Sequence, residues 1–359
     1  MQYIDEYRNK KLVLAVAGEI RKVSTKEITL MEVCGGHTMA IHRFGLQAVL
    51  PPNIHLLSGP GCPVCVSSQH FIDTAIAYCD IPDAIITTYG DLIRVPGSIS
   101  SLEKEKAGGH DIRIVYSVLE AVEIAKNHPT KPVFFLGIGF ETTAPATAAA
   151  IVQAKKERIG NFFVLSAHKV MPPALMALIE DGVGIDGFIA PGHVSAITGS
   201  AIYDDVVTSG RLGVVISGFE PVDILQSVLM LVNQYEYGNP KVEIQYRRIV
   251  HPQGNKIAQD LLSQVFELKD DRWRGLGVIP DSGLKIRKDF CEFDAENRFP
   301  VSVPEQADPA GCICGSILRG LKTPNDCGLF GTTCTPSDPV GACMVSAEGT
   351  CATFYKYRS

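Results

Sequence analysis

The sequence predicts an α/β fold in which two similar parallel-sheet domains face one another across a cleft and a third, small domain follows. Apolar, strand-like runs alternate with helical patterns from about residue 28 to residue 236, which is typical of parallel sheets covered by helices on both faces. Beyond that point the periodicity weakens, and six of the eleven cysteines lie between residues 312 and 351. A chain of 359 residues has room for two or three domains of about 150 residues.

The first domain is predicted over residues 28–128, after a helical segment, 1–27, that packs with another domain. Its predicted strands are residues 28–33, 54–58, 84–88 and 112–116, and its predicted helices are residues 37–49, 63–78 and 118–127. Pro63 fits the first position of a helix, which places Cys62 at the N-cap.

The strand–helix pattern restarts in a second predicted domain, residues 129–236. Its predicted strands are residues 133–137, 162–166, 187–190 and 214–217, and its predicted helices are residues 144–156, 172–179 and 221–234. Residues 237–359 form the third predicted domain, where proline, glycine and charge increase.

Composition excludes several classes of function. The formal charge of −6 and the lack of a run of basic residues argue against nucleic-acid binding. The N-terminus is polar and acidic, so it does not resemble a secretory signal. The longest apolar stretch, residues 133–152, contains Glu141 and Pro145, which argues against a membrane span. We therefore expect a cytoplasmic protein whose thiols serve metal or redox chemistry instead of a disulfide scaffold.

The cysteine-rich tail has the spacing of a metal site. Its first four cysteines follow the pattern C-x-C-x12-C-x6-C, which is unusual for a zinc ribbon. Our first choice is a [4Fe–4S] cluster, with structural zinc as the alternative. The four predicted ligands are Cys312, Cys314, Cys327 and Cys334. Cys343 and Cys351 are left over as a second dithiol pair or as substitute ligands, and Glu348, a further candidate catalytic residue, lies between them.

Cys34 is the first candidate for chemistry near the N-terminus. It directly follows a predicted strand and precedes a helix, and Gly35 and Gly36 allow the backbone to approach a ligand closely. A thiol near a helix N-terminus is expected to have a lowered pKa, which favours metal binding and nucleophilicity. The alternative is a buried cysteine that acts as a small hydrophobic residue.

The second candidate is the Cys62-Pro63-Val64-Cys65 sequence. Two cysteines three residues apart across a helix start can form a reversible disulfide or chelate one metal ion. The alternative is a chance spacing. Cys79 and Cys291 have no comparable context and are predicted to be structural.

His193 directly follows a predicted strand of the second domain. Ligands bind at the carboxyl ends of parallel strands, so His193 is expected to point into the cleft opposite Cys34. The alternative is a structural histidine. Other polar residues that follow strands and could line the cleft are Asp91, Arg94, Glu141, Thr142 and Thr143. Gly139-Phe140-Glu141 is echoed by Gly218-Phe219-Glu220, which we interpret as reuse of one turn.

Four motifs and the cysteine tail together resemble the HypD family of hydrogenase maturation factors. The motifs are Glu32-Val33-Cys34-Gly35-Gly36-His37-Thr38, Gly59-Pro60-Gly61-Cys62-Pro63-Val64-Cys65, Gly139-Phe140-Glu141-Thr142-Thr143-Ala144-Pro145 and Pro191-Gly192-His193-Val194-Ser195. The resemblance covers nearly the whole chain in order, with no departure at the motif positions.

The resemblance implies a role in building the Fe(CN)2CO unit of [NiFe]-hydrogenases. It implies work with a small chaperone, HypC, and with HypE, which delivers cyanide. Iron would be held between HypC and Cys34, with His193 at the same site and with Cys62 and Cys65 as a redox-active pair. It also implies two similar α/β domains and a third domain that holds a [4Fe–4S] cluster.

From these patterns we expect an assembly factor, and the sequence leaves open whether it turns over as a catalyst or serves as a platform. A rival from another class is an iron–sulfur thiol–disulfide reductase, which shares the cluster and the dithiol but assigns Cys34 no role. A third reading is a structural protein whose tail binds zinc.

Overall fold

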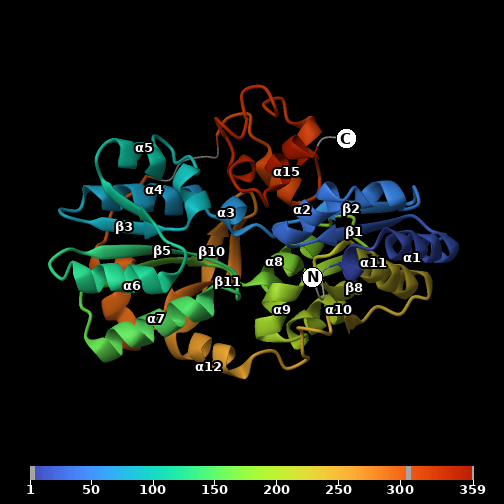
Figure 1. Cartoon of the computed structure of the whole chain (residues 1–359), viewed down its shortest axis with the longest axis horizontal. Coiled ribbons are helices and arrows are strands. Elements are labelled where there is room, and N and C mark those ends of the chain that lie inside the picture. Colours follow the sequence, from blue (N-terminus) through green and yellow to red (C-terminus); the bar gives the residue numbers. More distant parts are fainter. Residues whose placement is uncertain (1–4, 305–308, 358–359) are drawn as a thin grey trace.

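The computed structural model describes residues 5–304 and 309–357. Two α/β units lie side by side, an antiparallel hairpin stands between them, and the cysteine-rich tail covers one side of the junction (Figure 1). The ends of the predicted segments 1–27 and 237–359, at residues 1–4 and 358–359, lie outside the described residues, as do residues 305–308.

One unit contains a five-stranded parallel sheet with the strand order β2-β1-β7-β8-β9. The strands are β1 (Ile28–Glu32), β2 (Ile54–Ser58), β7 (Gly187–Pro191), β8 (Gly213–Ser217) and β9 (Val242–Ile244). Every residue of β7 and β8 is buried, as expected for parallel strands covered on both faces. The helices of this unit are α1 (Lys10–Val23), α2 (Gly35–Arg43), α9 (Gly192–Thr198), α10 (Asp204–Gly210) and α11 (Pro221–Glu236).

The other unit contains a four-stranded parallel sheet with the strand order β4-β3-β5-β6. The strands are β3 (Ile85–Thr88), β4 (Asp111–Ile114), β5 (Val133–Gly139) and β6 (Phe162–His168). Its helices are α4 (Gln69–Ala77), α5 (Leu102–Ala107), α6 (Val118–Asn127) and α7 (Ala144–Glu157), and α12 (Lys256–Val265) packs on α7. The α/β character and the parallel sheets agree with the prediction.

The predicted boundary between residues 128 and 129 does not separate the two sheets, so domains 28–128 and 129–236 are wrong as drawn. The chain leaves the five-stranded sheet after β2, completes the four-stranded sheet, and then returns, because β1 pairs in parallel with β7. The crossings are made by α3 (Pro63–Val66) and α8 (Met171–Glu180). Local apolar patterns predict strands but not their partners, and the β1–β7 pairing joins segments more than 150 residues apart.

Two predicted helices are each split by a polar or glycine residue. The predicted helix 37–49 becomes α2 and a 3-10 turn at Leu46–Val49, because Gly45 lies between them with a φ of 61°. The predicted helix 63–78 becomes α3 and α4, because the Ser68 side chain accepts a hydrogen bond from the backbone N–H of Phe71 and caps a new helix.

The predicted third domain, 237–359, contributes β9 to the five-stranded sheet and α12 to the other unit, and it contains a hairpin that the sequence analysis missed. β10 (Phe266–Trp273) and β11 (Gly277–Ile286) pair antiparallel and pack against β6, where the Ser166 hydroxyl donates to the Leu284 carbonyl. The short helices α13 (Ala295–Arg298), α14 (Cys314–Leu318) and α15 (Thr350–Lys356) follow. One apolar core runs through both sheets and the tail. None of the helices in the described ranges has the length and apolar character that crossing a bilayer requires.

Candidate functional site

Cys34 lies at the carboxyl end of β1, where it is the N-cap residue of α2. The loop after β2 presses against it: the Gly35 N–H donates to the Gly61 carbonyl at 3.2 Å. A β-carbon on Gly61 would lie 2.2 Å from the Cys34 backbone nitrogen, so only glycine fits there. Because Gly61 precedes Cys62, the lone cysteine and the C-x-x-C sequence lie on loops in direct contact.

Glu32 supports the Cys34 loop from inside the sheet. Its carboxyl group accepts hydrogen bonds from the Cys34 N–H at 3.1 Å and from the Thr38 hydroxyl. Glu32 is buried, and burial raises the pKa of this carboxyl to about 8. A protonated carboxyl can then sit under Cys34 at neutral pH without an unpaired buried charge.

The expected lowering of the Cys34 pKa is wrong for this structure. Burial is the largest cause of a rise in the pKa of the Cys34 thiol to about 12, and the charge of Glu348 adds to it. Hydrogen bonds from the first backbone N–H groups of α2 act in the opposite direction but do not prevail. Cys34 is therefore a protonated thiol in the metal-free chain, and it must release a proton to bind a metal.

His193 lies at the same edge of the five-stranded sheet as Cys34, because β7, which precedes it, pairs with β1. We predicted that His193 faces Cys34 from a second domain. That prediction is wrong, because both residues follow strands of the same sheet. The Phe219 ring stacks on His193 at 4.1 Å and on His37 at 4.6 Å between ring centroids. Burial lowers the pKa of both imidazoles, for His37 to about 4.

A pocket of about 770 Å³ opens beside these rings. Its lining includes Gly36, Arg43, His193, Phe219, Arg248 and Glu348. Cys34 is not a lining residue, but its sulfur would lie 3.8 Å from a β-carbon on Gly36. The Cys34 sulfur therefore lies close to Gly36, which is part of the pocket wall.

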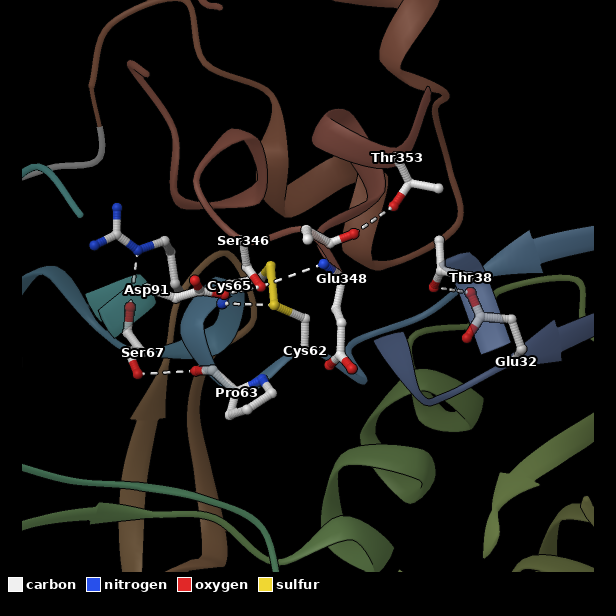
Figure 2. The surroundings of a disulfide bond; sticks show 12 residues. Glu32, Thr38, Cys62, Pro63, Cys65, Ser67, Asp91, Ser346, Glu348 and Thr353 are labelled. Carbon is white, nitrogen blue, oxygen red and sulfur yellow. Dashed lines mark hydrogen bonds between the residues drawn. A yellow bond between two sulfur atoms is a disulfide. The ribbon is translucent and has the colours of Figure 1, made fainter. Parts of the chain in front are cut away.

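Glu348 reaches this site from the cysteine-rich tail. A β-carbon on Gly35 would lie 2.6 Å from the Glu348 β-carbon, so the tail rests directly on the start of α2. Figure 2 shows the Glu348 side chain between the disulfide and the Glu32–Thr38 pair. Burial and the charge of Asp91 raise the pKa of the Glu348 carboxyl.

Cys62 and Cys65 are joined by a disulfide at the start of α3, with their Cα atoms 5.2 Å apart. Cys62 is the N-cap, as predicted, and its sulfur accepts a hydrogen bond from the Cys65 N–H at 3.2 Å. Both residues are buried. The tail covers this helix, and the Ser346 hydroxyl donates to the Asp91 carboxylate at 2.8 Å beside it (Figure 2).

The remaining polar candidates lie outside the pocket lining. Asp91 and Arg94 hold the tail, since Arg94 donates to the Pro336 carbonyl. Glu141 is buried and accepts a hydrogen bond from the Met171 N–H at 3.0 Å, and burial raises its pKa to about 7. The Thr143 hydroxyl donates to the Ile138 carbonyl, and Thr142 is half-buried.

The tail thiols gather around Cys314. Cys312, Cys343 and Cys351 each share a hydrogen bond with the Cys314 thiol, which raises the pKa of Cys343 and lowers that of Cys351. The Cys334 sulfur accepts from the Val340 N–H at 3.3 Å. A β-carbon on Gly341 would lie 2.7 Å from the sulfurs of both Cys312 and Cys314.

The chemistry of this donor set fits a metal–thiolate group, since soft thiolates suit both iron–sulfur clusters and zinc. Of the four predicted ligands, Cys327 lies at the rim, where its sulfur is 3.9 Å from the Gly311 carbonyl. Across the described part of the chain, no three histidine, cysteine, aspartate or glutamate side chains already surround a metal position. Cys79 is buried and Cys291 is exposed.

Sequence reasoning missed three residues of this site: Glu32, His37 and Phe219. Glu32 and His37 flank Cys34 in the motif, and their nearness was a usable signal. The only signal for Phe219 was the repeat of Gly139-Phe140-Glu141 in Gly218-Phe219-Glu220. A single aromatic residue after a strand usually indicates packing in the core.

Comparison with known proteins places the whole chain in one family. Residues 10–358 match the HypD profile, described as "Hydrogenase formation hypA family". The chain is 47% identical to hydrogenase maturation factor HypD2 of Bradyrhizobium diazoefficiens, over 99% of this chain and 97% of that protein. It is 46% identical to HypD of Cupriavidus necator (99% and 97% covered) and 43% identical to HypD of Escherichia coli (100% and 98% covered). The chain therefore belongs to the HypD family of hydrogenase maturation factors.

Proposed function

We propose that this protein scaffolds and assembles the Fe(CN)2CO unit of [NiFe]-hydrogenase, with iron as its cargo. The observation that carries the proposal is the direct contact between the Cys34 loop and the loop that bears the Cys62–Cys65 pair, at the edge of an open pocket. Such contact lets one thiol hold the metal while the neighbouring dithiol delivers electrons.

Iron binding is assigned to Cys34. Cyanide and CO favour low-spin Fe(II), which a soft thiolate suits. The proton of the raised-pKa thiol leaves when iron binds. His193 and Glu348 line the pocket in front of the thiol, where they can orient the incoming ligands. The open side of the pocket is the side on which HypC would share the iron and HypE would present cyanide.

The dithiol is assigned the reduction that frees cyanide. A thiocyanate-like carrier releases cyanide when its S–C bond breaks, which takes up two electrons and leaves the carrier as a thiolate. Cys62 and Cys65 supply both electrons as their thiols are oxidised to the disulfide, and their two protons pass to the carrier sulfur and to solvent. The cyanide ion then binds the iron held by Cys34.

The tail would reduce the disulfide again. Cys312, Cys314, Cys327 and Cys334 would hold a [4Fe–4S] cluster, with Cys343 and Cys351 beside it as a dithiol pair or as substitute ligands. When bound, such a cluster supplies electrons one at a time. The tail covers α3, so the path from these thiols to Cys62 and Cys65 lies inside the protein.

Infrared spectra of the protein purified with HypC test the proposal. We expect bands from iron-bound cyanide and CO, and we expect the Cys34→Ala variant to lose them. Surviving bands in that variant would mean that iron is held elsewhere. A Cys62→Ser/Cys65→Ser double variant that still assembled the unit at the normal rate would remove the dithiol from the reaction.

The rival function, a thiol–disulfide reductase acting on other proteins, fits the geometry less well. It gives Cys34 no role, although the Cys34 loop is in direct contact with the loop that bears the dithiol. Retained reductase activity toward a protein disulfide, without infrared bands, would support the rival.

A further inference from the structure

Arg274 is a buried arginine in the turn between β10 and β11, and none of the motifs contains it. Its side chain is 4% exposed. The Arg274 N–H donates to the Val66 carbonyl at 2.9 Å, and its Nε donates to the Ser67 carbonyl at 2.8 Å. These bonds tie the backbone and the guanidinium of Arg274 to the end of α3, the helix that starts with the Cys62–Cys65 pair.

The same turn also contacts the part of the cysteine-rich tail that contains Cys314. Gly275 and Gly315 are in backbone contact, since a β-carbon on Gly275 would lie 2.2 Å from the Gly315 Cα. Gly315 directly follows Cys314. Arg274 therefore lies between the dithiol helix and the tail thiols.

The Arg274 charge has no visible counterpart among the described residues. None of their carboxylates forms an ion pair with it, and its buried Nη2 has no hydrogen-bond partner there. An unpaired buried cation is costly, so native proteins usually pair it or neutralise it. The turn that carries Arg274 contacts Gly315, which directly follows Cys314, so the tail thiols could supply this negative charge once they are thiolates bound to metal.

We propose that Arg274 is the counter-charge of the metal–thiolate cluster, and that it favours the reduced cluster beside the dithiol. This inference rests on the proposed function, because it needs a redox-active cluster in the tail. Reduction adds one negative charge to a cluster that is already anionic. A fixed cation nearby stabilises the reduced state, and net charge and hydrogen bonds around the sulfurs are known to set cluster potentials.

The test is a redox titration of the purified, cluster-loaded protein, followed by visible absorbance and electron paramagnetic resonance. Arg274→Met keeps the length of the side chain but removes its charge, and Arg274→Lys keeps the charge. The control is Arg319→Met, which removes a half-buried arginine whose Nε donates to the Gly315 carbonyl at 3.4 Å. We expect Arg274→Met to lower the ratio of reduced to oxidised cluster at least tenfold at a fixed potential, or 59 mV for one electron. Arg274→Lys and Arg319→Met should stay within threefold of the wild type.

Iron and sulfide analysis separates the outcomes. Loss of the cluster in Arg274→Met alone, with Arg274→Lys loaded, would also support the counter-charge. An unchanged potential in a loaded Arg274→Met protein overturns the inference and leaves the proposed function intact. Loss of the cluster in both variants overturns it as well, because the guanidinium would then act through its bond to Ser67. Zinc or no metal in the wild type would sink the cluster of the proposed function itself.

Discussion

Gly61 approaches Cys34 so closely that a β-carbon on the glycine would lie 2.2 Å from the backbone nitrogen of the cysteine. The neighbouring atoms belong to the backbone of the β1–α2 turn, which is held in turn by the hydrogen bond from the Cys34 N–H to Glu32. The close approach of the Cys34 loop and the dithiol loop therefore depends on the lack of a side chain at Gly61.

Gly61→Ala should push these loops apart. Overpacking against a backbone that cannot move easily costs about 1–3 kcal/mol of unfolding free energy, and we expect the upper part of that range. The infrared bands of iron-bound cyanide should weaken, and the midpoint of thermal unfolding should fall. Gly184→Ala is the control, because nothing lies within 4 Å of its β-carbon. A Gly61→Ala protein as stable and as active as Gly184→Ala would show that the contact is dispensable.

Phe219 should fix the position of His193 through the ring stack. Phe219→Leu removes a stacking contribution of about 0.5–1.5 kcal/mol and lets water reach the imidazole. Because burial lowers the pKa of His193, we expect this pKa to rise toward its ordinary value in the variant. Nuclear magnetic resonance titration of the histidine rings measures the change.

Phe140→Leu is the matched control for Phe219→Leu. Phe140 occupies the equivalent place in the echoed turn but contacts the Trp273 ring in the core. Phe140→Leu should lower the unfolding free energy without changing the pKa of His193. An equal change of that pKa in both variants would indicate general loosening and not a positioning role for Phe219.

Much of the secondary structure follows from local sequence, and the pairing of the strands does not. β5 and β6 are continuous apolar runs, so their strand character is visible in the residues. β10 escaped notice because five of its eight residues, in Phe-Glu-Leu-Lys-Asp-Asp-Arg-Trp, bear charges, so the strand lacks an apolar run. The β1–β7 pairing depends on a return of the chain that no local pattern encodes.

The site shows the same limit. Cys34 and the Cys62–Cys65 pair were recognisable from glycine, proline and cysteine spacing alone. The pKa of Cys34 was not, because its rise depends on burial and on Glu348, which arrives from the tail more than 300 residues later. The pKa of a buried group depends on its tertiary neighbours. The helix N-terminus inferred from the sequence therefore predicted a lowered pKa for Cys34, where the structure gives a raised one.

The raised pKa of Cys34 predicts slow alkylation of the metal-free protein. Glu348→Gln removes a negative charge beside the thiol, which should lower the thiol pKa and increase the rate with iodoacetamide severalfold. The increase should not exceed about tenfold, the change in thiolate fraction for one pKa unit, because burial remains the larger cause. Mass spectrometry of the Cys34 peptide follows the reaction.

The control for this experiment is Glu220→Gln. Glu220 also lines the pocket, but its carboxylate is paired with the Arg8 guanidinium at 2.5 Å and does not act on Cys34. Its removal should leave the alkylation rate near that of the wild type. Equal rates in the two variants would mean that Glu348 carries no charge at the thiol.

His168 at the end of β6 should make the fold sensitive to mild acid. It is fully buried, with its ring nitrogens 3.3 Å from the Thr147 hydroxyl and 3.2 Å from the Ser166 hydroxyl. Burial, followed by the charge of Lys169, lowers its pKa to about 3. Between that value and the ordinary pKa of about 6.5 the unfolded chain binds a proton that the folded chain does not, so stability falls as pH falls.

From pH 6.5 to pH 5 this group should remove about 1.6 kcal/mol of unfolding free energy, because the slope rises from half of 1.36 kcal/mol per pH unit at pH 6.5 to nearly the full value at pH 5. His168→Gln has no group that titrates at this position. The unfolding free energy of the variant, relative to that of the wild type, should therefore increase by the same amount between pH 6.5 and pH 5. Thermal midpoints of both proteins at several pH values give the comparison, and the other buried groups cancel in the difference. Parallel profiles would mean that His168 becomes protonated in place, which would require the strands around it to admit water.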